Sequence, residues 1–257
     1  MSVALEQPAA ERARPMTREE KRVILASSAG TIFEWYDFYL YGSLAAIIGA
    51  QFFSSFPEAT RNVFALLAFA AGFLVRPFGA LFFGRLGDLV GRKYTFLMTI
   101  LIMGASTFIV GLLPTYNQIG WIAPVTLIIL RMLQGLALGG EYGGAVVYVA
   151  EHAPPGRRGY FTSWIQTTAT LGLLLSLMVI LSVRSYMGEK DFAEWGWRIP
   201  FLLSIFLLGI SLWIRLQMEE SPAFKKMKEE GRQSKAPLSE AFGQWKNARF
   251  AVIALLG

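Results

Sequence analysis

The sequence predicts an all-α integral membrane protein, on the strength of three observations. Hydrophobic residues occupy 54% of the 257 positions and charged residues only 16%, with a mean hydropathy of +0.45. Six apolar stretches reach the length of about 20 residues that a membrane-spanning helix requires. Most basic residues lie in the connections between these stretches, where they act as topology signals. This composition is typical of a membrane protein rather than a soluble domain.

The six apolar stretches predict six transmembrane helices in chain order. Strands of a membrane barrel would be about half as long and would alternate in polarity, which these stretches do not. We therefore expect a six-transmembrane-helix bundle over residues 23–217. The predicted spans are Val23–Phe53, Val63–Phe83, Tyr94–Leu113, Trp121–Val149, Tyr160–Val183 and Trp197–Leu216.

The segments that flank this bundle have a different composition. Residues 1–22 are polar and mix acids with bases, which predicts a cytoplasmic N-terminal tail rather than a signal peptide. Residues 218–247 predict a cytoplasmic linker, with short surface helices at Pro222–Glu230 and Leu238–Trp245. Residues 248–257 are apolar again and predict the start of a truncated seventh transmembrane helix. The chain is then either a fragment or a natural truncation.

The distribution of Lys and Arg predicts the orientation. With a cytoplasmic N-terminus, 17 of them fall on the inner side and four on the outer side. We expect a multi-pass protein of the plasma membrane, the inner membrane of a bacterium, with its N-terminus in the cytoplasm. The net charge of +6 is explained by topology, so nucleic acid is not an expected partner.

The residue types available restrict the chemistry. There is no cysteine, and His152 is the single histidine, which argues against metal sites built from thiolate or imidazole ligands. No nucleophile and base pair is identifiable, so an enzyme is not expected. We expect neither a metal nor a cofactor.

Five ionisable residues fall inside the predicted spans and away from their ends, where charges are costly and usually mark solute or proton pathways. They are Glu34, Asp37, Arg76, Arg131 and Glu141. Depths calculated at about 1.5 Å per residue match Asp37 best with Arg131 and place Arg76 to meet Glu34 or Glu141. Three acids against two bases leave one carboxylate unpaired, and such a group tends to take up a proton. The alternative is a set of static ion pairs that only fixes packing.

Two further patterns accompany these charges. Tyr36 and Tyr39 lie beside the acids of the first span, where they are candidates for the wall of a solute cavity or for ordinary packing. Gly135, Gly139 and Gly143 recur at every fourth position of the fourth span. Small residues at this spacing allow close helix contact, either static or able to slide during a conformational cycle.

The decapeptide Gly84–Lys93 is the most polar segment between the first spans. Its glycines allow tight turning, and Asp88 precedes two basic residues. We expect a hinge with a sharp reversal between the second and third helices. Its candidate gating residues are Gly84, Asp88, Gly91, Arg92 and Lys93.

This decapeptide is similar to the signature loop of the major facilitator superfamily, and Arg131–Gly135 resembles a second motif of that superfamily. Further motifs resemble the metabolite:proton symporter family, which includes α-ketoglutarate, citrate, shikimate and proline/betaine carriers. They are Phe33–Tyr39, Gly139–Gly143, Gly156–Tyr160, Glu194–Phe201 and Glu220–Pro222.

The resemblance implies half of a twelve-helix carrier that works by alternating access, with a C-terminal six-helix half as its partner. It also implies that Asp88 and Arg92 form an inner gate and that Asp37 and Arg131 are the coupling pair. The expected partners are then a small-molecule solute, protons and the lipid bilayer. The expected activity is proton-coupled symport of a small organic acid or a zwitterionic metabolite. The alternative is a non-transporting half-carrier that acts only as an interaction or assembly module.

Overall fold

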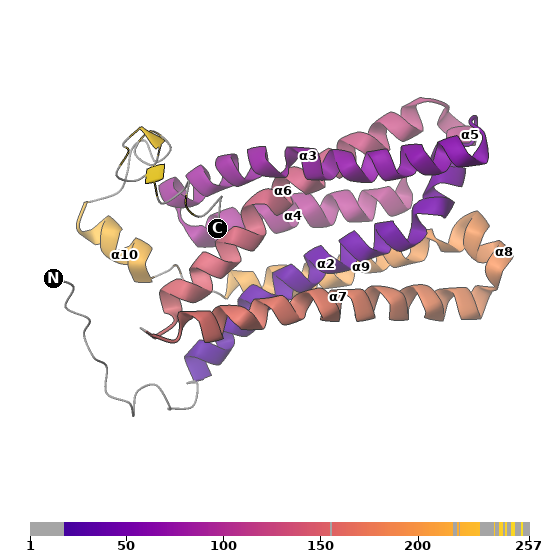
Figure 1. Cartoon of the computed structure of the whole chain (residues 1–257). Coiled ribbons are helices and arrows are strands. Elements are labelled where there is room, and N and C mark those ends of the chain that lie inside the picture. Colours follow the sequence, from indigo (N-terminus) through magenta and orange to yellow (C-terminus); the bar gives the residue numbers. More distant parts are fainter. Residues whose placement is uncertain are drawn as a thin grey trace.

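Six long helices form the body of the protein. The structure, a computed structural model, describes residues 18–154, 156–217, 220 and 222–231, with a few isolated positions beyond. The long helices run side by side along one direction (Figure 1). They are α2 (Arg18–Phe52), α3 (Glu58–Val90), α4 (Arg92–Leu112), α6 (Ile122–His152), α7 (Arg158–Met187) and α9 (Arg198–Leu216).

Short helices close the two ends of this bundle. One end carries α5 (Tyr116–Ile119), α8 (Glu189–Asp191) and a π-helical turn, η1 (Phe192–Gly196). The amphipathic helix α10 (Pro222–Glu229) lies beyond the opposite end, near the α3–α4 connection, and confirms the first of the two predicted surface helices. The predicted tail, the second surface helix and the start of a seventh span fall largely outside the described residues.

Membrane-spanning character is present in most of the long helices. By length and composition, α3, α4, α6, α7 and α9 could each cross a membrane. Helix α2 has 35 residues and ample length, but Glu34, Asp37 and the polar aromatic residues around them lower its hydropathy. It nevertheless packs within the same bundle against α7, α3, α6 and α9. The six-helix bundle predicted from the sequence is therefore confirmed.

The Gly84–Lys93 segment corrects one prediction. Helix α3 continues through Gly84 and Asp88 as far as Val90, and α4 begins at Arg92. The expected hinge is confined to Gly91, whose φ of 109° favours glycine. Glycine inside a helix costs only about 1 kcal/mol, so Gly84 remains helical. Most of the predicted loop is thus the last turns of α3.

Glycines allow α3 and α6 to approach closely. An added Cβ at Gly135 would lie 2.8 Å from the Cα of Gly72, and one at Gly139 would lie 2.8 Å from the amide nitrogen of Ala80. At Gly143 an added Cβ would meet nothing within 4 Å. The predicted glycine face is therefore a close helix contact at its first two positions and open at the third.

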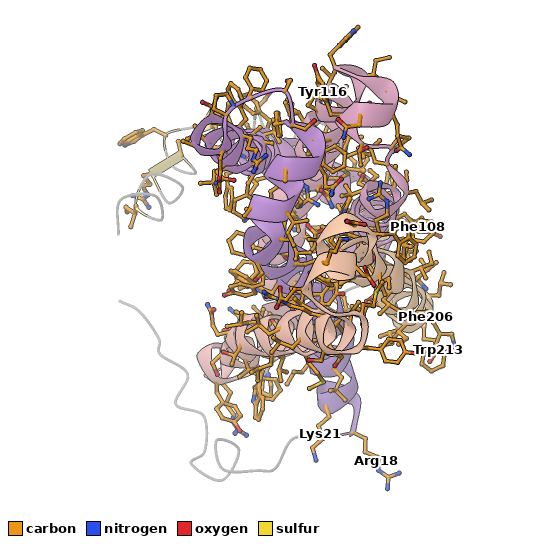
Figure 2. The ribbon with its side chains drawn as sticks, turned by 90° about the vertical axis from the view of Figure 1, so that its right-hand side faces the viewer. Arg18, Lys21, Phe108, Tyr116, Phe206 and Trp213 are labelled. Carbon is orange, nitrogen blue, oxygen red and sulfur yellow. The ribbon has the colours of Figure 1, made fainter. Side chains whose placement is uncertain are left out.

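The interior and the outer surface are both apolar, as expected in lipid. The main core includes Tyr41, Ile100 and Trp197, each fully buried. Large apolar side chains also cover much of the outside of the helices. Figure 2 shows Phe108 of α4 with Phe206 and Trp213 of α9 along one outer face.

Candidate functional site

Asp37 and Arg131 form a buried ion pair in the middle of the bundle, as their depths predicted. Asp37 is 2% exposed and Arg131 is 4% exposed. The Arg131 Nη1–H donates to Asp37 Oδ2 over 3.0 Å, and Nη2–H donates to Oδ1 over 3.3 Å. The guanidinium also stacks 4.2 Å from the centroid of the Tyr41 ring. This two-point contact fixes both side chains in one orientation.

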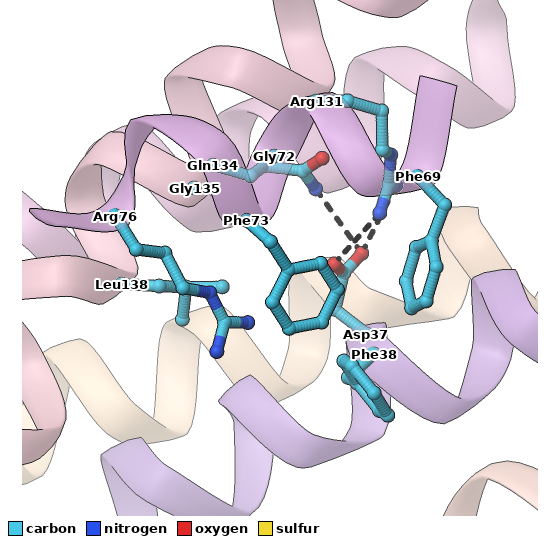
Figure 3. Close-up of a pocket in the computed structure, with 10 residues that line it drawn as sticks. All are labelled: Asp37, Phe38, Phe69, Gly72, Phe73, Arg76, Arg131, Gln134, Gly135 and Leu138. Atoms are coloured by element: carbon cyan, nitrogen blue, oxygen red, sulfur yellow. Dashed lines mark hydrogen bonds and ion pairs between the residues drawn. The ribbon is translucent and has the colours of Figure 1, made fainter. Parts of the chain in front are cut away.

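Two neutral side chains complete the surroundings of Asp37. The Gln134 Nε2–H donates to Oδ1 over 3.1 Å, and the Thr107 hydroxyl lies 3.0 Å from the same oxygen. Gln134 also donates to the Thr107 hydroxyl over 2.7 Å. Figure 3 shows Arg131 and Gln134 converging on the carboxylate from α6. Asp37 is therefore tied to α4 and α6 and has its acceptor sites occupied.

A second buried ion pair joins Glu141 to Arg215. Both side chains are at most 3% exposed, and Arg215 Nη1–H also donates to the Phe96 carbonyl over 2.9 Å. Gly30 of α2 is needed beside this pair, because an added Cβ there would overlap the Arg215 guanidinium. The pair therefore connects α6 to α9, the Phe96 carbonyl connects it to α4, and α2 packs against it at Gly30. It is one of two buried ion pairs among the described residues.

This second pair corrects the sequence-based charge balance. Arg215 lies at the end of the predicted sixth span and counts among the 17 basic residues of the inner side, whereas in the structure it is the last buried residue of α9. Together with the partly buried Arg76, the charges inside the bundle are therefore three acids and three bases, and Glu141 does not pair with Arg76. The sequence pattern that could have indicated the burial of Arg215 is the helical spacing of the buried residues of α9, which are Ser204, Leu208, Ser211 and Arg215.

Glu34 and Arg76 remain without an ion-pair partner among the described residues. Glu34 is 4% exposed, and its Oε2 accepts no hydrogen bond. Arg76 places its guanidinium 4.3 Å from the centroid of the Phe73 ring, and its buried Nε–H is also unsatisfied. In Figure 3, Arg76 lies apart from the Asp37 carboxylate, and no dashed line reaches it. One buried negative and one partly buried positive group are thus left unpaired.

Both groups line the same open recess, which we call the α2–α3–α6 recess. Its volume is about 1020 Å³, and its wall includes Glu34, Trp35, Arg76, Pro77 and Tyr142. Pro77 lies inside α3 and has no N–H, so the Phe73 carbonyl loses its usual partner one turn earlier. A much smaller hollow adjoins Asp37 and shares Arg76 with the recess. The wall therefore combines charges and aromatic faces.

The tyrosines predicted beside the acids have different positions. Tyr36 is buried, and its hydroxyl donates to the Pro200 carbonyl over 2.7 Å, so it ties α2 to α9. Tyr39 is partly exposed and stacks on Trp35 with ring centroids 5.8 Å apart. Tyr39 is thus adjacent to one wall residue of the recess, whereas Tyr36 faces away into the packed interior.

The candidate gating residues lie together at the end of the bundle that carries Gly91. Asp88 pairs with Arg92 one turn later over 3.0 Å, and Asp88 is 43% exposed. The backbone N–H groups of Arg92 and Lys93 donate to the Glu220 carboxylate over 2.9 and 3.2 Å. The sequence analysis predicted no contact for Glu220. Here it caps the start of α4, so the segment after α9 is attached to the α3–α4 junction.

Among the described residues, no three histidine, aspartate or glutamate side chains come close enough together to hold an ion.

The fold defines a class of protein, the multi-pass membrane proteins with the major facilitator fold. The structure of the proton:xylose symporter XylE bound to 6-bromo-6-deoxy-D-glucose superposes with a TM-score of 0.73 at 18% identity, over 83% of this chain and 47% of that one. The inward-open xylose transporter XylE from Escherichia coli gives 0.69 at 17% identity, over 90% and 54%. At this identity the likeness shows the fold.

Residues 23–251 match the family described as "Sugar (and other) transporter", and the chain belongs to this family of membrane transporters, which are not enzymes. Among curated proteins, it is 43% identical to the proline/betaine transporter of Escherichia coli (strain K12), over 80% of this chain and 41% of that protein. It is 39% identical to the shikimate transporter of the same strain, over 91% and 54%. The chain spans about half the length of these relatives.

Proposed function

We propose that this chain supplies the N-terminal half of a proton-coupled symporter for a small organic acid or zwitterionic metabolite. The observation that carries the proposal is the contrast between the Asp37–Arg131 pair, which has a two-point contact, and Glu34 and Arg76 in the adjoining recess, which have no ion-pair partner among the described residues. Unpaired charge inside a membrane protein is costly and is retained where a solute or proton uses it.

The recess favours a solute that carries both signs of charge. Arg76 would hold a carboxylate, and Glu34 with the face of Trp35 would hold a cation. Such a solute adds no net charge to the six balanced charges inside the bundle, whereas an anion would require Glu34 to be neutralised by a proton. The relatives named as proline/betaine and shikimate transporters represent these two solute types.

The Asp37–Arg131 pair is the proposed coupling element. Protonation of Asp37 would weaken its hold on Arg131 and release the contact between α2 and α6. The two helices could then change their relative position, which alternating access requires.

The gate and the orientation complete the proposal. With the N-terminus in the cytoplasm of a bacterial inner membrane, Asp88 and Arg92 lie on the inner side, where the Arg92 backbone N–H donates to Glu220. Asp88 is partly exposed and would bind a helix N-terminus in a C-terminal six-helix half. Two facing halves would also enclose the recess, which this chain leaves open.

Solute uptake into proteoliposomes that hold the complete carrier tests the proposal. Labelled glycine betaine, proline and shikimate are compared with and without an imposed pH gradient, acidic outside. We expect accumulation against a concentration gradient only when the pH gradient is present. Accumulation that is independent of the pH gradient would disprove proton coupling. Absence of uptake for every solute, in carrier that remains folded, would disprove transport of these solutes.

A thermal-shift screen separates the solute classes. Betaine and proline should stabilise the detergent-purified carrier across neutral pH. If shikimate or dicarboxylates alone stabilise it, the solute is an organic acid and the zwitterion assignment is wrong.

A further inference from the structure

A basic recess lies at the end of the bundle that carries Gly91, away from the proposed transport site. It is bounded by the end of α3, the start of α4 and helix α10, and its open volume is about 910 Å³. Lys93, Lys225 and Lys228 contribute three ammonium groups to its wall. Glu220 is the single carboxylate of the wall, and its oxygens already accept two backbone N–H groups of α4. The recess is therefore suited to an anion.

The position of α10 keeps these ammonium groups at the bundle. Phe224 is 7% exposed and packs over Gly91, where an added Cβ would lie 3.3 Å from its ring. Lys93 is fixed from the other side, because its Nζ–H donates to the Leu216 carbonyl over 2.9 Å at the end of α9. Lys225 and Lys228 follow Phe224 by one and four residues on α10 and reach the same recess.

An exposed apolar stripe begins at this recess and follows α4 along the bundle. Its side chains recur at helical spacing and are each 42–62% exposed: Tyr94, Met98, Leu101, Ile109 and Leu112. Tyr94 stands at the junction, since it lines the recess and begins the stripe. A tyrosine with one polar end is the type of residue that marks a membrane interface. The stripe provides the surface that an acyl chain would cover.

We propose that this recess binds the headgroup of an anionic phospholipid, with one acyl chain along the α4 stripe. The lysines contact the phosphate, and their own methylene stems pack on the apolar wall. The adjoining stripe commits the site to a lipid, because a free phosphate ion would have no use for it. This assignment does not depend on transport activity or on the solute.

Native mass spectrometry of the chain in nanodiscs of equal phosphatidylglycerol and phosphatidylcholine measures the retained lipids. The test variant is Lys225→Gln with Lys228→Gln, and its control is Lys226→Gln with Lys190→Gln. The control removes the same charge, from the far face of α10 and from the other end of the bundle. We expect phosphatidylglycerol retention to fall about 10- to 30-fold in the test variant, since each lysine near an anionic surface contributes about fivefold. The control should retain it within about twofold.

Equal losses of phosphatidylglycerol retention in both variants would show that general surface charge, and not a specific site, retains the lipid. This result would overturn the proposed site. A phosphatidylglycerol with a photoreactive headgroup, used on the unmodified chain, should label α10 and the start of α4. Labelling elsewhere would also overturn the proposed lipid site. This photolabelling experiment uses no variant, so its result remains valid even if a variant misfolds. Millimolar inorganic phosphate or glycerol phosphate should not displace the lipid. Displacement by either would identify the ligand as a soluble anion.

Discussion

Glu34 and Asp37 lie one turn apart on α2, and both are at least 96% buried, yet their surroundings are opposite. Asp37 has a two-point contact with Arg131 and further contacts with Gln134 and Thr107. Glu34 has no hydrogen bond and no ion pair among the described residues. The difference arises from the neighbouring helices, because α4 and α6 present polar groups to Asp37, whereas the α2–α3–α6 recess opens beside Glu34.

In the proposed function, this difference gives two roles to one helix. A carboxylate whose acceptor sites are occupied holds helices together. Loss of its contacts would allow these helices to change their relative position. A carboxylate with free acceptors beside an open recess is available to a solute. The variants below test this division, in order of their expected effect on stability.

Arg131→Gln should give the largest loss of stability. It leaves the Asp37 carboxylate buried without a cation, which costs about 3–5 kcal/mol. Adding Asp37→Asn should recover most of this loss, because the amide needs no counter-ion. Unfolding by sodium dodecyl sulfate in mixed micelles measures both variants. If Arg131→Gln unfolds like the parent, the pair does not hold the bundle together.

Gly139→Ala tests whether the α3–α6 contact sets the position of Arg76. The new Cβ would lie 2.8 Å from the Ala80 amide nitrogen and would push away the helix that carries Arg76. We expect a loss of about 1–3 kcal/mol, as for other overpacked contacts. Gly143→Ala is the matched control, since its Cβ meets nothing within 4 Å, and it should change stability by less than about 0.5 kcal/mol. Equal effects of the two substitutions in the same unfolding assay would contradict the contact.

Thr107→Val removes the neutral oxygen near Asp37 without changing the shape of the side chain much. Arg131 and Gln134 still occupy the carboxylate, so the expected loss is only about 1 kcal/mol. The same unfolding assay measures it. A loss as large as that of Arg131→Gln would mean that the hydroxyl, and not the cation, holds Asp37.

Sequence reasoning predicted the Asp37–Arg131 pair because helical rise fixes depth, and two spans of one bundle share the same depth scale. It could not predict the Glu141–Arg215 pair from depth alone. Arg215 lies at the end of a span, where a basic residue usually reports topology, and only its spacing with Ser204 and Ser211 indicated burial. The resulting error in the charge balance concerned the number of bases, whereas Glu34 still lacks an ion-pair partner.

The second feature that the sequence could not predict is the local conformation of the backbone. Three glycines in the Gly84–Lys93 segment each permit a turn, but only Gly91 turns, because helix propensity tolerates the other two. The Glu220 cap on α4 joins residues 127 and 128 positions apart, and no local pattern encodes such a contact. Resemblance to a family located these segments without defining their geometry.

Glu34→Gln should have the smallest effect on stability and a large effect on function. Glu34 has no ion-pair partner to lose, and the substitution removes a costly buried charge, so unfolding should show no loss of stability. The neutral amide cannot attract a cationic group, so the betaine-induced thermal shift of the complete carrier should disappear. Glu194→Gln, which changes an exposed carboxylate at the other end of the bundle, is the matched control and should keep the shift. Unchanged betaine binding by Glu34→Gln would remove Glu34 from the solute site, while destabilisation equal to that of Arg131→Gln would show that both carboxylates are structural.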